Sequence, residues 1–225
     1  MDGVLIVDKP QGMTSHDVVD FIRKHFGLKK VGHAGTLDPM ATGVLVILIG
    51  RYTKSSNIFS SDNKEYHAEI TLGADSDTGD AWGALTPRRT ELKVSQDEVR
   101  AVFKKFLGTI EQVPPAYSAV KYKGRKLYEF ARKGIKVRVD PRKVTIEKLE
   151  IINISLPKIS FVINCSKGTY VRSLASDIGE ALRCGAYLSS LKRTFSGRFG
   201  IDSAVSMDEL KNIKAIDLKE RLLSL

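Results

Sequence analysis

One carboxylate in this chain lies in a segment whose backbone is strongly restricted. Asp38 falls within residues 32–43, a stretch that contains three glycines and Pro39. Glycine permits positive φ or close backbone approach, whereas proline fixes its own φ and keeps the preceding residue extended. The run that follows, residues 44–49, is wholly apolar and predicts a buried strand. We therefore expect a stiff loop that presents Asp38 as a reactive group. The structural alternative is an Asp-Pro turn in which the Asp38 carboxylate only caps a backbone N–H.

The charge of the chain is positive and unevenly distributed. Its 225 residues are 42% hydrophobic and carry a net charge of +10. Residues 121–148 hold eleven Lys or Arg against three Asp or Glu, and residues 183–198 hold four Lys or Arg and no acid. Positive charge gathered in two blocks favours a polyanionic partner, such as a nucleic acid, over a merely basic surface.

Several other classes of protein are disfavoured. There is no apolar run of 18 residues and no signal-peptide pattern, so we expect no membrane association. Cys165 and Cys184 are far apart, which indicates reduced thiols in a compartment such as the cytoplasm and neither a disulfide framework nor a zinc site. Residues 75–80 begin like a calcium loop, but Thr86 stands where that loop needs glutamate. Phosphate-loop, dinucleotide-binding and nucleophile-elbow motifs are absent.

Hydrophobic periodicity and helix-capping signals predict helices and strands in mixed order. We expect strands at 3–8, 44–49, 65–72, 144–156 and 159–165, and helices at 15–26, 95–108, 171–182 and after Ser206. Strict alternation of strand and helix is missing. This favours an α+β fold around a mixed or mostly antiparallel sheet flanked by helices.

Five ordered motifs extend the interpretation beyond the Asp38 loop. They are Lys9-Pro10-x-Gly12-x-Thr14-Ser15, Gly32-His33-x-Gly35-Thr36-Leu37-Asp38-Pro39-x-Ala41-Thr42-Gly43, Lys64-Glu65-Tyr66, Pro114-Pro115-x-Tyr117-Ser118-Ala119-x-Lys121 and Ser166-Lys167-Gly168-Thr169-Tyr170-Val171-Arg172. Together with Leu191, Lys192 and Arg193, they resemble the bacterial tRNA pseudouridine-55 synthases, which isomerise a uridine in the T loop of tRNA. The resemblance implies the pseudouridine synthase fold, with residues 1–225 as a single catalytic domain.

The resemblance also implies roles for individual residues. Asp38 would be the nucleophile, Tyr66 would stack on the flipped uracil, and Arg172 would pair with Asp38 and orient it. Attack at C1′, attack at uracil C6 and a glycal route all remain open for Asp38. The other residues expected to wall the pocket, support the loop or contact RNA are His33, Tyr170, Leu191, Lys9, Lys64, Lys121, Arg132, Lys192 and Arg193. The resemblance implies no metal or organic cofactor, and we expect a cytoplasmic monomer that binds the T stem-loop of tRNA.

Two further expectations concern the basic block and the end of the chain. Residues 121–143 interleave positive and aromatic side chains, with a short helical pattern between Gly124 and Gly134. We predict a mobile RNA-contacting insertion, with a permanently docked helix as the alternative. Many family members carry a further RNA-binding domain of the PUA type, whereas this sequence stops at Leu225. A non-catalytic tRNA-binding or folding factor, and a synthase that acts on another RNA, remain alternative functions.

Overall fold

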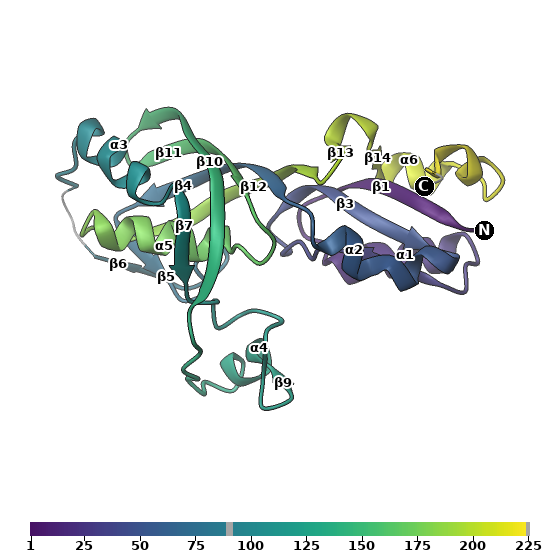
Figure 1. Cartoon of the computed structure of the whole chain (residues 1–225), viewed down its shortest axis with the longest axis horizontal. Coiled ribbons are helices and arrows are strands. Elements are labelled where there is room, and N and C mark those ends of the chain that lie inside the picture. Colours follow the sequence, from purple (N-terminus) through teal and green to yellow (C-terminus); the bar gives the residue numbers. More distant parts are fainter. Residues whose placement is uncertain (89–91, 224–225) are drawn as a thin grey trace. The chain divides into compact units, whose positions relative to one another are not determined.

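The structure is a computed structural model that describes residues 1–88 and 92–223. The chain divides into two compact units, which Figure 1 shows with their elements labelled. Unit 1 comprises Met1–His67 and Leu191–Leu225, and unit 2 comprises Ala68–Ser190. The single catalytic domain over residues 1–225 stays a prediction, and its last residue, Leu225, lies outside the described part of the chain.

Unit 1 is built on a mixed sheet with the strand order β14-β1-β3-β12. β1 (Gly3–Lys9) lies antiparallel to β3 (Thr42–Ile49) and parallel to β14 (Val205–Ser206). The carboxyl-terminal half of β12 (Ala186–Ser196) pairs in parallel with the start of β3. β2 (Val31–Ala34) pairs antiparallel with β3. The other elements of this unit are α1 (Ser15–His25), η1 (Gly50–Ser55), α2 (Ser56–Ser60), β13 (Phe199–Gly200), η2 (Ile201–Ser203), α6 (Met207–Asn212) and η3 (Asp217–Arg221).

The apolar run of β3 forms the centre of unit 1, as its sequence predicts. Val44, Val46 and Leu48 pack with residues of β1 and with Phe199 in one hydrophobic cluster. Because side chains alternate along a strand, Leu45 and Ile47 point to the opposite face, and they are equally buried. A strand enclosed on both faces cannot shift its register without exposing apolar surface, so β3 gives the loop before it a fixed end point.

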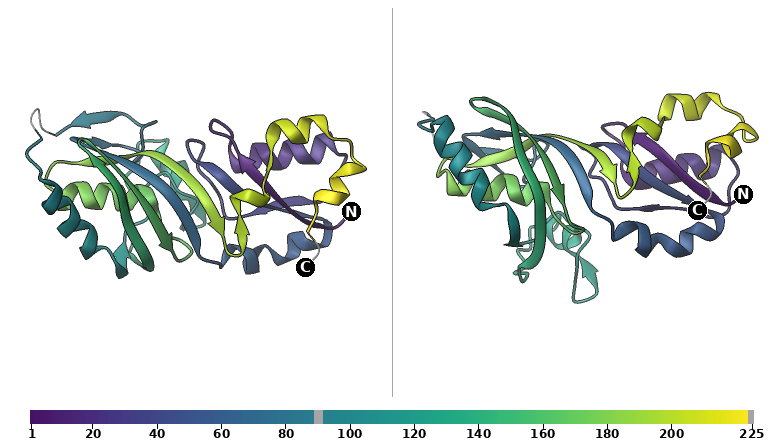
Figure 2. Two further views of the ribbon diagram at one scale, coloured as in Figure 1. Left: turned by 90° about the horizontal axis from the view of Figure 1, so that it is seen from above. Right: turned by 45° about the horizontal axis from the view of Figure 1, so that its top comes forward.

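Unit 2 contains a sheet with the strand order β12-β4-β11-β10-β7. Its strands are β4 (Lys64–Leu72), β7 (Gly108–Gln112), β10 (Arg142–Ser155) and β11 (Lys158–Cys165), while β5 (Ala74–Ser76) and β6 (Leu85–Pro87) pair separately. Helix α3 (Gln96–Lys105) packs against β10 and α5 (Val171–Ala181), as the two views of Figure 2 show. The rings of Phe103 and Phe161 pack edge to face, with their centroids 5.3 Å apart. The predicted α+β architecture with a mixed sheet is therefore confirmed.

The basic insertion of unit 2 is less helical than its sequence suggested. Between β7 and β10 the chain forms a hairpin, β8 (Lys121–Tyr122) with β9 (Arg125–Lys126), and then the single short helix α4 (Leu127–Ala131). Figure 1 shows this segment extending away from the sheet of unit 2. Four cations lie over aromatic rings of the insertion at 5.2–5.5 Å; they are Lys123, Arg125, Lys126 and Arg132. Like charges oppose a longer helix here, while contacts between cations and rings stabilise the compact hairpin. The mobility of the segment stays a prediction.

Candidate active site

The loop that carries Asp38 is tightly constrained at both ends. Gly35 and Gly43 have φ of 82° and 98°, in the region that disfavours residues with a side chain. A Cβ at Gly43 would lie 2.2 Å from the carbonyl oxygen of Arg193, so only glycine fits against β12. Between these ends, the amide of Ala41 donates to the carbonyl of Asp38 at 3.0 Å and closes a turn around Pro39. These constraints fit the predicted stiff loop, and Asp38 is half-buried in it.

The segment before α1 holds this loop from one side. Ser15 is buried, and its hydroxyl accepts from the amide of Leu37 at 2.8 Å and donates to the Leu37 carbonyl at 3.1 Å. The amide of Gly12 donates to the carbonyl of Pro39 at 2.9 Å. The same segment starts α1 with the predicted capping box of Thr14 and Asp17. The first and second motifs of the sequence therefore meet in space, because one supplies hydrogen-bond partners to the backbone of the other.

The serine at the centre of this contact gives a first prediction. Ser15→Ala is expected to lower the free energy of unfolding by about 1–3 kcal/mol, because both backbone groups of Leu37 lose their buried partner. Chemical denaturation measures this change. Ser203→Ala is the matched control, since the Ser203 hydroxyl donates to a single carbonyl at an exposed position. Equal stabilities of the two variants would show that the Ser15 contact contributes nothing.

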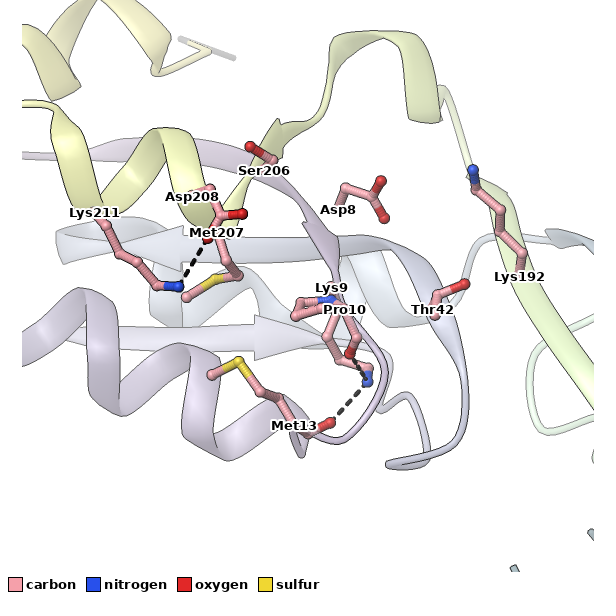
Figure 3. A pocket seen from close by; sticks show the side chains of 10 residues that line it. All are labelled: Asp8, Lys9, Pro10, Met13, Thr42, Lys192, Ser206, Met207, Asp208 and Lys211. Carbon is pink, nitrogen blue, oxygen red and sulfur yellow. Dashed lines mark hydrogen bonds and ion pairs between the residues drawn. The ribbon is translucent and has the colours of Figure 1, made fainter. Parts of the chain in front are cut away.

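Lys9 lies at the end of β1 with its ammonium group buried beside the loop. Its Nζ donates to the carbonyls of Pro10 and Met13 at 2.9 and 2.7 Å, as Figure 3 shows. Burial lowers the pKa of Lys9 to about 8; the nearby negative Asp38 opposes this shift and positive Arg193 adds to it. The geometry therefore fits the loop-supporting role expected for Lys9.

A cavity of about 470 Å³ adjoins Lys9 in unit 1 (Figure 3). Its lining residues come from β1, the following turn, β3, β12, β14 and α6; they are Asp8, Lys9, Pro10, Met13, Thr42, Lys192, Ser206, Met207, Asp208 and Lys211. Lys192 is exposed here, in keeping with the RNA contact predicted for it.

Aromatic and aliphatic residues predicted to surround the base also belong to unit 1. Tyr66 on β4 and Leu191 on β12 are 8% and 7% exposed, so each offers only an edge to solvent. His33 on β2 is half-buried, and burial, followed by the charges of Arg193 and His16, lowers the pKa of its imidazole. Tyr66 and Leu191 are thus largely enclosed apolar side chains of unit 1, the kind that can help to exclude water from a detached base.

Two cations expected to contact RNA are instead buried. Lys64 is 6% exposed and donates to the carbonyls of Ser60 and Asp62. Arg193 is 1% exposed and donates to the carbonyls of Val44 and Gly35. The sequence revealed their charge but not their burial. Direct contact with phosphates does not fit this arrangement, whereas Lys121, Arg132 and Lys192 are all exposed.

Arg172 lies in the first turn of α5 within unit 2, where it is 4% exposed. Its Nη1 donates to the carbonyl of Thr78 at 2.7 Å and its Nη2 to that of Tyr117 at 2.9 Å. Nε lies 3.7 Å from the carboxylate of Asp80. The backbone amide of Tyr170 donates to Gln112 Oε1 at 2.7 Å and fixes the start of the helix. Arg172 is thereby held by the loop that contains Thr78 and by Tyr117, which lies between β7 and β8.

Asp80 is a residue that sequence reasoning missed. It is 6% exposed, and its carboxylate accepts from the Thr78 hydroxyl and from the amide of Trp82. The signal in the sequence is the acidic segment 75–80, whose spacing does not fit a calcium loop. A carboxylate buried beside an arginine orients the guanidinium and offsets its charge. The predicted pair of Asp38 with Arg172 joins residues of the two units and stays a prediction.

Comparisons with known proteins identify the family of the chain. The family described as TruB family pseudouridylate synthase (N terminal domain) matches residues 23–171, and the tRNA pseudouridylate synthase B C-terminal domain matches residues 172–224. The tRNA pseudouridine synthase B of Alkaliphilus oremlandii is 48% identical over 96% of this chain and 72% of its own length. That of Opitutus terrae is 42% identical over 99% of this chain and 92% of its own.

Solved structures support the same fold. The chain in the crystal structure of a Cbf5-Nop10-Gar1 complex aligns with a TM-score of 0.74 and 32% identity, over 98% of this chain and 57% of that one. A chain from an H/ACA RNP bound to a substrate RNA containing 2′-deoxyuridine aligns with a TM-score of 0.72 and 29% identity, over 99% of this chain and 56% of that one. This chain thus spans little more than half the length of these two chains. The predicted pseudouridine synthase fold is confirmed. Among the described residues, no helix is long and apolar enough to cross a bilayer.

Proposed function

We propose, because the chain belongs to the TruB family of pseudouridylate synthases, that it isomerises a uridine in the T loop of tRNA to pseudouridine. The observation that carries the proposal is the clamped loop that presents Asp38, the position that matches the catalytic loop of the resembled family. Relatives named tRNA pseudouridine synthase B share 42–48% of their residues with this chain over nearly its whole length. An RNA uridine isomerase is therefore the activity that family, fold and loop geometry support together.

The reaction exchanges one glycosidic bond for another. The N1–C1′ bond of uridine breaks, the uracil turns, a C5–C1′ bond forms, C5 loses its hydrogen to solvent and N1 takes up a proton. A stacked base cannot turn, so the uridine must leave its stack, which costs a few kcal/mol. Stacking on an aromatic face such as Tyr66 returns about 1–3 kcal/mol. A dry pocket wall, to which Leu191 belongs, keeps the detached uracil from escaping.

Asp38 is the group proposed to carry the covalent chemistry. A carboxylate acts as a nucleophile toward C1′ or uracil C6, and on a glycal route it would remove the 2′ hydrogen of the ribose. Arg172 is proposed to pair with Asp38 in the reacting enzyme, and its guanidinium suits bidentate bonding to a carboxylate better than an ammonium would. The bonds of Arg172 to Thr78 and Tyr117, and the nearby Asp80, support this proposal because they pre-set the orientation of the guanidinium.

The proposed stacking role of Tyr66 gives a second prediction. Tyr66→Leu should reduce the rate of pseudouridine formation roughly 10- to 100-fold, because it removes a stacking surface worth about 1–3 kcal/mol. Tyr66→Phe should retain RNA binding, and if the phenol moves a proton its loss will slow a later step. Rates under single-turnover conditions measure both effects. His67→Leu, at the exposed neighbouring position, is the control. A Leu variant as fast as the parent chain would exclude stacking on Tyr66.

The exposed basic residues are proposed to bind the phosphates of the T stem-loop. Each phosphate contact releases counterions, so the logarithm of the binding constant should fall with the logarithm of salt concentration by about 0.7–0.9 per contact. Titration of labelled tRNA at several salt concentrations measures this slope. Lys121→Ala and Arg132→Ala should each reduce it by about one. A slope near zero would contradict the proposal that these residues bind RNA phosphates.

Isotope release tests the proposed activity itself. tRNA transcribed with [5-³H]uridine should release close to one tritium per molecule to solvent, because C5 becomes the attachment point of the ribose. A transcript whose target T-loop uridine is replaced by cytidine should release none. Binding without release would favour a non-catalytic tRNA-binding factor, and release from the cytidine transcript would favour another RNA position. We propose in addition that the enzyme acts as a monomer in the cytoplasm, without a metal or organic cofactor.

A further inference from the structure

Arg193 is among the largest fully buried side chains in the described part of the chain. It comes from β12, and its backbone lies opposite Gly43 in the parallel pairing of β12 with β3. Burial of a guanidinium group is costly unless its donors are satisfied. The hydrogen bonds that compensate for the burial of Arg193 therefore indicate its role.

Its two recorded side-chain hydrogen bonds go to the two ends of one loop. Nε donates to the carbonyl of Val44 at 2.6 Å, and Nη2 donates to the carbonyl of Gly35 at 2.9 Å. Residues 36–43, which include Asp38, lie between those two acceptors. Because the guanidinium is planar and rigid, bonds to both carbonyls fix the separation of the loop ends.

Gly43 is fitted closely to the backbone of Arg193, and Gly35 lies in ordinary contact with its guanidinium group. A Cβ at Gly35 would lie 3.4 Å from Nη1 of Arg193, and a Cβ at Gly43 would lie 2.2 Å from the Arg193 carbonyl oxygen. Both glycines have positive φ. Because glycine is flexible, contacts from the surrounding structure are needed to hold it in that one conformation. Arg193 provides that support from β12, whereas Ser15 and Gly12 bond to other backbone groups of the loop, those of Leu37 and Pro39.

We propose that Arg193 is a positioning residue that holds the Asp38 loop in its reactive geometry by tying the carbonyls of Gly35 and Val44 together. The inference rests on the proposed function, since it takes Asp38 as the reacting group. Arg193 acts through the backbone of the loop and does not touch RNA. A displacement of a reacting group by about 1 Å is enough to cost on the order of 100-fold in rate, so loss of this tie acts on the chemical step.

Two variants of Arg193 and one control test the proposal. Arg193→Met removes all donors while keeping an apolar stem, and Arg193→Lys keeps the charge but presents its donors from one atom. Arg23→Met makes the same exchange at a partly exposed position of α1, where Arg23 pairs with Asp20. Each protein is assayed for the single-turnover rate at saturating tRNA, the dissociation constant for tRNA and the melting temperature.

The expected pattern separates positioning from binding. Arg193→Met should lose about 100-fold in single-turnover rate, and Arg193→Lys should fall between it and the parent chain. Both should bind tRNA within about threefold of the parent, because neither removes an exposed cation. Arg23→Met should match the parent in single-turnover rate at saturating tRNA.

The outcomes are distinguishable from failure of the proposed function. If the parent chain forms no pseudouridine, the proposed function fails. Suppose instead that the parent chain is active. If Arg193→Met or Arg193→Lys is folded and as fast as the parent at saturating tRNA, only the positioning role is overturned. A loss confined to tRNA affinity would overturn it as well and return Arg193 to RNA contact. If Arg193→Met does not melt cooperatively, the test rests on Arg193→Lys alone. A slower single-turnover rate at unchanged tRNA affinity supports the positioning role, and an unchanged rate overturns it.

Discussion

Asp38→Asn is expected to reduce pseudouridine formation by roughly 10⁴-fold or more, the scale seen when a reacting group is deleted from an active site. The substitution keeps the size of the side chain and removes its nucleophilic charge. The hydrogen bonds that shape the loop come from backbone groups of Leu37, Pro39 and Ala41 and remain in place. Binding of tRNA should therefore change by less than about threefold, since no phosphate contact is lost.

Single-turnover assays with excess enzyme measure this effect without interference from product release. Asp202→Asn makes the same chemical change at an exposed position of unit 1 and should leave the rate unaltered. The tRNA affinity of both variants comes from a filter-binding or fluorescence titration. A single-turnover rate of the Asp38 variant that is a substantial fraction of the parent rate would show that Asp38 does not take part in the chemistry.

Arg172→Lys is also expected to produce a large loss, about 100-fold in single-turnover rate. Lysine keeps the positive charge but cannot donate in three fixed directions, toward the Thr78 carbonyl, the Tyr117 carbonyl and a carboxylate. The loss should therefore appear in the rate at saturating tRNA, because orientation of the charge and not its presence is changed.

Asp80→Asn is the informative partner of this variant. Removal of the carboxylate 3.7 Å from Nε frees the guanidinium from one of its restraints while leaving its charge and other bonds intact. Its rate should lie between that of the parent chain and that of Arg172→Lys, and the double variant should be no slower than Arg172→Lys alone. Additive losses would mean that Asp80 acts independently of Arg172.

Local structure was predictable wherever one signal dominated. The capping boxes at Thr14 and Ser95 and the apolar run of β3 specified α1, α3 and β3 to within a few residues. Two strands of five or more residues were missed, β7 and β12, and so were the shorter strands. β7 had been assigned to the end of a helix at Gly108, and β12 alternates buried and exposed residues only irregularly. Their pairing depends on partners distant in sequence, which no local pattern reveals.

The site shows a similar division between chemistry and geometry. Asp38 was identified from a loop whose glycines and proline restrict its own backbone, and the structure confirms that restriction. The burial of Lys64 and Arg193 was not predictable, because a positive charge in a basic chain is usually exposed. Asp80 was missed since its importance comes from lying beside Arg172, which is far away in sequence.

Mapping the modified position in a full-length unmodified tRNA tests the central claim most directly. After incubation with this protein, each nucleotide is examined for pseudouridine by a chemical adduct that stops reverse transcription, with Asp38→Asn enzyme as the blank. The account predicts one pseudouridine, in the T loop, approaching one per tRNA molecule with the parent chain and absent with the variant. Full-length tRNA that is bound but carries no pseudouridine, or pseudouridine only outside the T loop, would contradict it.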